Sequence, residues 1–238
     1  MSYNSLYLAA AGLLTLFLSR ILIPIIRKIA ISGDLVDVPN NEPDKIHGQP
    51  IPHLGGVAIF ISLVGGFIFL LLVVEVDLRK SLGVLAGGFL AFALGLWDDL
   101  GWKRKIETYK PNVKFLIQVL VSASIACILW FSGHQFRFIP VSIIGIIASA
   151  FYVFGGMNAI NMQDGLDGIA GGVTILSGAG FAVISFLLSN ELGFAISILL
   201  ISSVLGFLFF NLPPASIFMG DGGSHFLGIL LASLAILL

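Results

Sequence analysis

Runs of apolar residues, most of them close to twenty residues long, divide this sequence and limit what it can fold into. An α-helix needs about 20 such residues to cross the roughly 30 Å hydrocarbon core of a bilayer. The runs predict membrane spans at about 5–26, 54–74, 82–97, 114–131, 141–157, 171–188 and 194–210. Only 11% of the residues are charged. We therefore predict an all-α, polytopic transmembrane helical bundle that forms a single domain over residues 1–238.

An eighth apolar run begins near Phe226 and reaches Leu238. Its thirteen residues would extend only about 20 Å as a helix, which is less than the thickness of the hydrocarbon core. We expect seven complete spans and a truncated eighth, in a domain that is cut off at its C-terminus.

The distribution of lysine and arginine predicts how the helices are oriented in the membrane. Loops after odd-numbered spans hold eight of these residues, and loops after even-numbered spans hold three. The first group is Arg27, Lys28, Lys45, Lys103, Arg104, Lys105, Lys110 and Lys114, and the second is Arg79, Lys80 and Arg137. Because cytoplasmic loops carry the basic excess, we expect the N-terminus outside and the odd loops inside. The net charge of -1 predicts no nucleic-acid partner.

A polar, glycine-rich segment at residues 158–172, NAINMQDGLDGIAGG, separates two apolar runs. Its polar side chains recur at every third position, as Asn158, Asn161, Asp164 and Asp167. Such groups are costly beside lipid unless a polar or charged partner meets them, so they predict a pocket for a cation or a phosphate ester. Gly165 and Gly168 would allow positive φ and a close approach of main-chain amides. A solvated turn is the alternative, and it would explain any one of these residues more easily than the whole run.

Three more carboxylates follow apolar runs on the same side of the predicted membrane. Asp98 and Asp99 are adjacent in GLWDDL, and they would repel each other unless a cation lay nearby, which indicates a metal or a proton-accepting role. Asp221 lies among glycines in MGDGGSH. One exposed carboxylate suits Mg²⁺, which takes oxygen ligands and shares substrate phosphates. Hydration of these acids at helix ends is the simpler alternative.

A proline-rich loop precedes the second span and contains KIHGQPIPHLGG. Lys45 and His47 in this loop could contact phosphate, although a solvated loop histidine is the commoner case.

Taken together, VDVPN, KIHGQPIPHLGG, GLWDDL, NAINMQDGLDGIAGG and FNLPPASIFMGDGGS resemble motifs of the polyprenyl-phosphate N-acetylhexosamine-1-phosphate transferases, membrane enzymes of the WecA/MraY type. The resemblance extends over nearly the whole chain from about Val36. The first loop lacks the Thr-Pro-Thr-Met-Gly-Gly form of the muramoyl-pentapeptide branch and looks closer to the GlcNAc-1-phosphate branch. Members of the family also have further helices and a His-rich loop, which this sequence does not contain.

The resemblance implies transfer of a sugar 1-phosphate from a UDP-N-acetylhexosamine to undecaprenyl phosphate, with release of UMP. It implies Mg²⁺, with Mn²⁺ as a substitute, bound by Asp221, and catalytic roles for Asp98 and Asp99. Substrate binding would fall to Lys45, His47, Asn158, Asn161, Asp164, Gly165, Asp167 and Phe218. The expected location is the inner membrane of a bacterium, with the active site cytoplasmic, and a homodimer is compatible with this family.

A carboxylate-lined membrane cation transporter is the main alternative, because intramembrane acids often line cation paths. Here the acids gather at one predicted membrane face instead of near mid-span, and no inverted repeat is visible. Both observations favour the transferase.

Overall fold

The computed structural model describes residues 5–39, 49–103, 111–134, 136, 139 and 142–238. The helices in this part are α1 (Ser5–Ser32), α2 (Gly55–Val73), α3 (Leu78–Lys103), α4 (Pro111–Phe131), α5 (Ser142–Gln163), α6 (Ile169–Leu187), α7 (Glu191–Asn211) and α8 (Gly220–Leu237). Each is long and apolar enough to cross a membrane. The predicted all-α bundle of membrane spans is therefore confirmed.

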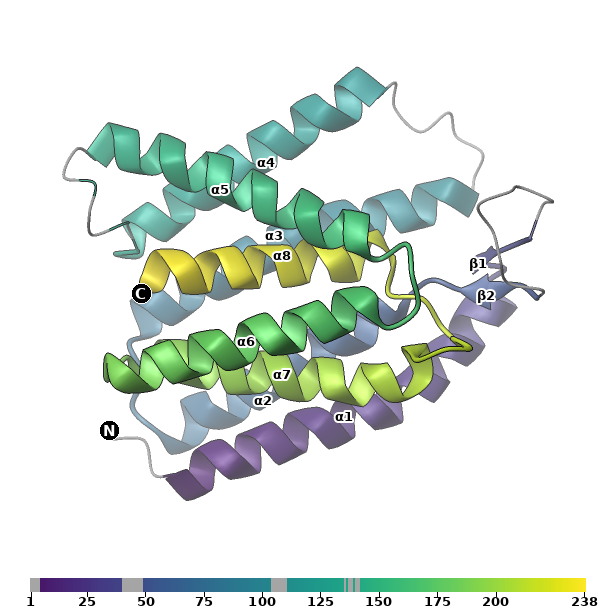
Figure 1. Cartoon of the computed structure of the whole chain (residues 1–238), viewed down its shortest axis with the longest axis horizontal. Helices are drawn as coiled ribbons and strands as arrows, with labels where there is room; N and C mark the ends of the chain where they lie inside the picture. Colours follow the sequence, from purple (N-terminus) through teal and green to yellow (C-terminus); the bar gives the residue numbers. More distant parts are fainter. Residues whose placement is uncertain (1–4, 40–48, 104–110, 135, 137–138, 140–141) are drawn as a thin grey trace.

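The helices run back and forth along one direction, so that each connection lies at one of two ends of the bundle (Figure 1). In Figure 1, α8 lies at the centre beside α3, α4 and α5 lie above it, and α1, α2, α6 and α7 lie below. Helices α1, α3, α5 and α7 end, and helices α2, α4, α6 and α8 begin, at the right-hand end. The candidate site lies there, and we call it the site end.

Helix α8 is the most enclosed helix of the bundle: 72% of its most apolar window is buried, against 28% for both α4 and α5. Its sequence explains this position, because Gly222, Gly223, Ser224 and Gly228 are small and let neighbouring helices approach closely. A Cβ atom on Gly95 of α3 would overlap the main chain at Asp221. The close contact between α3 and α8 therefore requires glycine at that position.

The outer surface of the bundle is apolar. Phe151 and Leu176 are 78% and 75% exposed, and they belong to a large set of exposed Leu, Ile and Phe side chains on the outer helices. Hydrocarbon around the bundle would solvate such side chains, whereas the helical backbone satisfies its own hydrogen bonds.

Helix boundaries differ from the apolar runs at the site end. Helix α1 continues to Ser32, α3 continues to Lys103 and α5 continues to Gln163, so Asp98, Asp99 and Asn161 lie inside helices. Helix α8 begins at Gly220 instead of near Phe226, which corrects the expected short eighth span to a helix of 18 residues. Hydropathy marks only the apolar part of a helix, and polar turns stay helical where neighbours satisfy their side chains.

A small antiparallel sheet closes the site end beside α2. Strand β1 (Val36–Asp37) pairs with strand β2 (Ile51–Pro52), with Val36 opposite Pro52 and Asp37 opposite Ile51. The Phe218 amide donates to the Pro52 carbonyl at 2.7 Å, and the Gly55 amide donates to the Phe218 carbonyl at 2.9 Å. These bonds connect β2 and the start of α2 to the segment that leads into α8.

Candidate functional site

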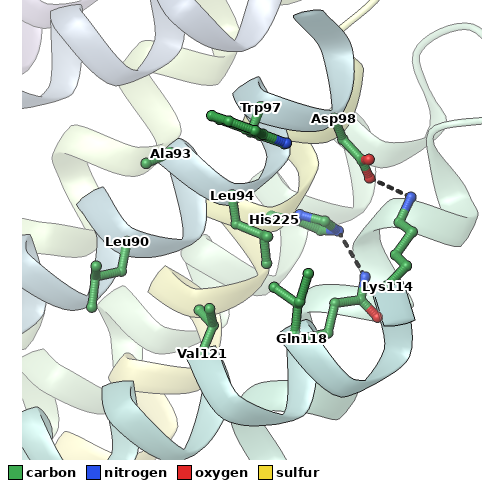
Figure 2. A pocket seen from close by; sticks show the side chains of 10 residues that line it. Leu90, Ala93, Leu94, Trp97, Asp98, Lys114, Gln118, Val121 and His225 are labelled. Atoms are coloured by element: carbon green, nitrogen blue, oxygen red, sulfur yellow. Dashed lines mark hydrogen bonds and ion pairs between the residues drawn. The ribbon is translucent and has the colours of Figure 1, made fainter. Parts of the chain in front are cut away.

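One ammonium group joins two of the predicted carboxylates at the site end. Lys114 in the first turn of α4 lies with its Nζ 2.5 Å from Asp98 Oδ2 on α3 (Figure 2). The same Nζ lies 3.2 Å from Asp221 Oδ2 on α8. The Lys114 side chain is 43% exposed, so the cluster remains open to solvent or ligand. The consecutive helices α3 and α4 and the distant helix α8 thus place opposite charges at one point.

Asp99, the neighbour of Asp98 on α3, contacts the main chain of α8 and caps that helix. Its two oxygens accept hydrogen bonds of 2.9 Å from the main-chain amides of Asp221 and Gly222. Amides in the first turn of a helix have no partner within that helix, and the positive end of the helix dipole favours an anion. Asp99 is 8% exposed, and we interpret it as a residue that positions Asp221. Adjacent carboxylates therefore have separate surroundings, which the sequence alone could not show.

Asn161 near the end of α5 orients the carboxylate of Asp221. Its Nδ2 donates to Asp221 Oδ1 at 2.7 Å and to Ser224 Oγ at 3.0 Å. Asp221 therefore receives donors on both oxygens, from Asn161 on one and from Lys114 on the other. Both contacts fix its rotamer at the point where four helices meet.

Asp164, in the turn after α5, supports the start of α8. Its Oδ2 accepts a hydrogen bond from the Gly220 amide at 3.2 Å. Gly220 adopts a φ of 78°, and a Cβ there would also meet the Asp99 carboxylate, so glycine is needed for this turn. Burial raises the pKa of Asp164 well above its usual value, against the opposing effect of the Gly220 hydrogen bond.

Two other polar side chains of the 158–172 segment form hydrogen bonds outside the first turn of α8. Asp167 Oδ2 accepts from the Ala215 amide at 2.9 Å, which joins the start of α6 to the connection between α7 and α8. Asn158 donates to the Phe154 carbonyl one turn earlier in α5. Of the four side chains expected to surround one ligand, only Asn161 and Asp164 hydrogen-bond to the first residues of α8.

The glycines of this segment also differ from each other. Gly168 has a φ of 76° where α6 begins, whereas Gly165 is not among the residues with positive φ. Gly165 is exposed in the turn, and its predicted contact with substrate stays a prediction. Phe218 takes part through its main chain, which joins β2 and α2 to the start of α8.

The predicted phosphate contacts Lys45 and His47 lie outside the described residues. His53, from the same sequence motif, does reach the site: its Nε2 lies 3.3 Å from the main-chain oxygen of Asp99. The proline-rich loop thus contributes at least one side chain next to the carboxylates.

Sequence reasoning missed Lys114 as a site residue and treated it only as a loop charge. Its position at the edge of an apolar run was the available signal, because a charged side chain beside lipid is costly without a partner. Gln118 and His225 were also missed, and their amide and ring nitrogens lie 3.5 Å apart beneath the cluster (Figure 2). Neither residue is part of a motif that its spacing in the sequence would reveal.

The donor set is suited to a hard divalent cation that also binds phosphate oxygens. Within the described part of the chain, no three His, Cys, Asp or Glu side chains form a preformed metal cage. Mg²⁺ does not need one, because it commonly takes one or two carboxylates with waters and substrate phosphates. Asp98 and Asp221 direct oxygens at the same cationic group, Lys114, and so converge as two such ligands would.

The fold is a bundle of membrane-length helices, and a cluster of carboxylate, amide and lysine side chains lies at one end of it. These two features define a polytopic membrane protein with a polar site for a charged ligand. The chain belongs to glycosyl transferase family 4, whose family model matches residues 81–238. This match confirms the family resemblance inferred from the motifs.

Individual relatives agree with the family. A probable undecaprenyl-phosphate N-acetylglucosaminyl 1-phosphate transferase of Bacillus subtilis is 34% identical over 97% of this chain and 63% of its own length. Phospho-N-acetylmuramoyl-pentapeptide-transferases of Staphylococcus carnosus and Clostridium acetobutylicum are 30% and 32% identical, covering 96% and 91% of this chain and 74% and 70% of theirs. The chain thus spans about 63% of the Bacillus relative's length.

Proposed function

We propose that this protein transfers N-acetylhexosamine 1-phosphate, with GlcNAc-1-phosphate as the preferred group, from a UDP-sugar to undecaprenyl phosphate in cell-envelope biosynthesis. The observation that carries the proposal is the convergence of Asp98, Lys114 and Asp221 at the end of three helices. The names of the relatives supply the substrates, and the polar site at a membrane end suits a soluble nucleotide and a lipid phosphate. A transporter would need its carboxylates along a path through the bundle.

The reaction joins two anions. An oxygen of the lipid phosphate attacks the sugar-bearing phosphorus of the UDP-sugar, a new P–O–P bond forms, and UMP leaves with the electrons of the broken P–O bond. Lys114 offsets negative charge at this point, and the exposed part of its side chain leaves its ammonium accessible. Asp98 lies at the entrance to the site, where it can orient or deprotonate the lipid phosphate.

The remaining residues hold the site in place. Asn161 fixes the orientation of Asp221, and Asp99 and Asp164 hold the first amides of α8. A fixed arrangement matters because phosphoryl transfer depends mainly on positioning and on stabilising charge.

Mg²⁺, or Mn²⁺ in its place, is the cofactor we propose, with Asp221 as its main ligand and Asp98 beside it. The ion would neutralise diphosphate charge and polarise the reacting phosphoryl group. Without the cation, the negative charges of Asp98 and Asp221 would exceed the single positive charge of Lys114, and the site would repel both anionic substrates.

Release of UMP tests the proposal directly. Purified protein in nanodiscs is incubated with undecaprenyl phosphate, Mg²⁺ and either UDP-GlcNAc or UDP-MurNAc-pentapeptide, and UMP is measured. We expect UMP release that requires both substrates, is abolished by EDTA and is restored by Mg²⁺. Preference for UDP-GlcNAc supports the GlcNAc branch, and exclusive use of the muramoyl substrate would reassign the donor. No UMP with either donor contradicts the proposed function.

We further propose that the site end faces the cytoplasm in the inner membrane of a bacterium, with the N-terminus outside. Cysteine labelling tests this in a Cys127→Ser background. Ser32→Cys at the site end should resist an impermeant thiol reagent applied to intact cells, whereas Asp77→Cys at the opposite end should react. The reverse pattern contradicts the orientation. The homodimer stays a prediction. Measuring the mass of the protein in detergent would test it.

A further inference from the structure

Two arginines of α1 contact the end of α7 on the outside of the bundle. In Figure 1, α1 and α7 lie below α8, whereas α4 lies above it, so these arginines are separate from the Lys114 cluster. The Arg20 guanidinium carbon lies 4.4 Å from the centre of the Phe209 ring. Arg27 Nε donates to the Ser216 carbonyl, in the connection after α7, at 3.0 Å. Both side chains therefore lie along the contact between α1 and α7, which we call the α1–α7 seam.

The inner side of the α1–α7 seam is closed by tight packing. Ser19 Oγ donates to the Ser203 carbonyl at 2.7 Å, and a Cβ on Gly206 would overlap Ser19. Arg20 follows Ser19 and has no room between the two helices. Its side chain is exposed, and its ring partner Phe209 is 59% exposed. The two arginines are thus accessible from the surroundings of the bundle.

The outer side of the seam changes from apolar to cationic towards the site end. Exposed residues at helical spacing line it, namely Phe17, Arg20 and Arg27 on α1 and Leu205, Phe209 and Leu212 on α7. Arg20 and Arg27 are about 10 Å apart along α1 at 1.5 Å per residue. Phe17 and Leu205 lie further from the site end and are 55% and 37% exposed. A phospholipid has the same order of groups, from acyl chain to charged headgroup.

The positive charge of the two arginines is not neutralised within the described part of the chain. Helix α1 and residues 192–219 contain no Asp or Glu. Asp167 accepts a hydrogen bond from the Ala215 amide, beside Ser216, and forms no ion pair with Arg27. The terminal nitrogens of the Arg27 guanidinium have no hydrogen bond to a described residue. They remain available for an anion, and a planar guanidinium matches the oxygens of a phosphate.

The depth of Arg20 favours a lipid over a soluble anion. Its guanidinium lies over Phe209, two residues before α7 ends at Asn211, so it is level with the last turn of that helix. Ile21 and Ile25 beside it are 60% and 49% exposed. A charge among side chains that face hydrocarbon is costly unless it reaches the interface or meets a counterion there. An anion with its own hydrocarbon fits this surface, whereas a nucleotide would leave the apolar part uncovered.

We propose that the outer side of the α1–α7 seam binds an anionic phospholipid, whose phosphodiester contacts the guanidinium groups of Arg20 and Arg27 and whose acyl chains follow Phe17 and Leu205. This site lies beyond the proposed function and does not depend on the reaction. Arg27 also holds the Ser216 carbonyl, in the connection that leads from α7 into α8. A lipid that fixes Arg27 therefore stabilises the contact between α1 and this connection.

Titration with phosphatidylglycerol tests the two guanidinium groups. Purified protein in detergent is titrated with this lipid, and the bound fraction is measured by native mass spectrometry, with phosphatidylcholine as the zwitterionic reference. One basic residue near an anionic membrane surface contributes a factor of about five to binding. We expect Arg20→Gln and Arg27→Gln each to weaken phosphatidylglycerol binding about fivefold, and the double variant about 25-fold. Binding of phosphatidylcholine should stay unchanged.

Arg79→Gln is the matched control at the opposite end of the bundle. Arg79 is exposed, and its Nε donates to the Phe131 carbonyl at 2.8 Å, as Arg27 donates to Ser216. Its loss removes the same charge far from the seam, so phosphatidylglycerol binding should change less than about twofold. An equal loss in Arg79→Gln would show a general effect of net charge and overturn the proposal. If Arg27→Gln misfolds, Arg20→Gln decides alone, because it removes no hydrogen bond to a described residue.

Thermal unfolding separates lipid binding from a purely structural role of the arginines. In nanodiscs that contain phosphatidylglycerol, the wild type should unfold at a higher temperature than in nanodiscs of phosphatidylcholine, because a ligand of the folded state raises its stability. This difference should disappear in the Arg20→Gln/Arg27→Gln double variant. A decrease of the same size in both lipids would show that the arginines serve the fold alone, and the lipid site would be wrong.

Competition and photolabelling identify the occupant. Phosphatidylglycerol with a diazirine in its acyl chain should label residues 13–27 and 205–212, and unlabelled phosphatidylglycerol should compete. Displacement by inorganic phosphate would make the ligand a soluble anion, and displacement by undecaprenyl phosphate at lower concentration than by phosphatidylglycerol would make it the acceptor. Either result, or labelling of other helices alone, overturns the assignment to phospholipid. None of these measurements involves UMP release, so their outcome is independent of the proposed function.

Discussion

At the site end of the bundle polar groups pair with one another, whereas at the opposite end the ring of the buried His134 has no hydrogen-bond partner among the described residues. Asp98, Lys114, Asp221 and Asn161 contact each other in one cluster. His134 is 2% exposed, and neither ring nitrogen has a partner within the described part of the chain. Burial lowers the pKa of His134 to about 4, and the nearby Lys80 acts in the same direction.

The two ends differ in how they treat charge. The site end holds paired charged side chains, whereas the surroundings of His134 disfavour a charged imidazole. At the site end, carboxylates are held near a cation and partly open to ligand, which is expensive unless the charges are used. At the opposite end, a neutral imidazole serves as a packing group, and protonation would oppose folding. Loss of a charge that faces the ligand should therefore change turnover, whereas substitution of His134 should change stability alone.

The largest effect is expected for Asp221→Asn. The change keeps the shape of the side chain and removes its charge, so we expect UMP release to fall at least about a hundredfold, or roughly 2.7 kcal/mol of transition-state stabilisation. The thermal midpoint should change little. A turnover near that of the wild type, with the same Mg²⁺ requirement, would remove Asp221 from the metal site and favour Asp98 or Asp164.

Asp99→Ala should reduce stability more than Asp221→Asn does. It leaves the Asp221 and Gly222 amides without their acceptor in a buried place, at a cost of about 2 kcal/mol. Thermal unfolding in detergent measures this loss, and Asp99→Asn should recover part of it because one acceptor oxygen remains. If Asp99→Ala keeps the thermal midpoint but loses turnover, Asp99 has a direct catalytic role instead of a positioning one.

His134→Leu should change the pH dependence of stability and leave turnover intact. The folded-state pKa of His134 is about 4 and its unfolded value is near 6.5, so below pH 6.5 the unfolded chain binds the proton first. Stability therefore falls as the pH decreases, by up to about 2 kcal/mol between pH 6.5 and 5. Thermal midpoints at several pH values test this, since the difference between wild type and variant isolates His134. Parallel pH profiles would show that the imidazole is not held neutral.

Asp77→Asn should have the smallest effect. Asp77 is at the opposite end, where it forms an exposed ion pair of 3.5 Å with Lys80, and the Lys80 amide hydrogen bond lowers its pKa. Exposed pairs of this kind contribute less than about 1 kcal/mol. Turnover and thermal midpoint should both stay close to the wild type. A hundredfold loss here would mean that acidic residues at both ends of the bundle matter for activity.

Part of the site could be predicted because chemistry-bearing residues stand out in an apolar sequence. Asp98, Asp164 and Asp221 were all expected at one membrane face, and the bundle brings them to one end. The distinction between Asp98 and Asp99 could not be predicted, because it depends on which way each side chain leaves α3. Lys114 was missed because its partners lie on other helices, Asp98 on the preceding α3 and Asp221 on the distant α8.

By itself the sequence determined that the chain forms a series of membrane-spanning helices and on which side the acids gather, because a bilayer demands long apolar runs and rejects unpaired charge. The tertiary structure alone decided that α8 occupies the centre, that Asp99 caps it and that Lys114 joins Asp98 to Asp221. These outcomes depend on how closely small residues let the helices approach, and contacts between helices leave no periodic mark along a single chain.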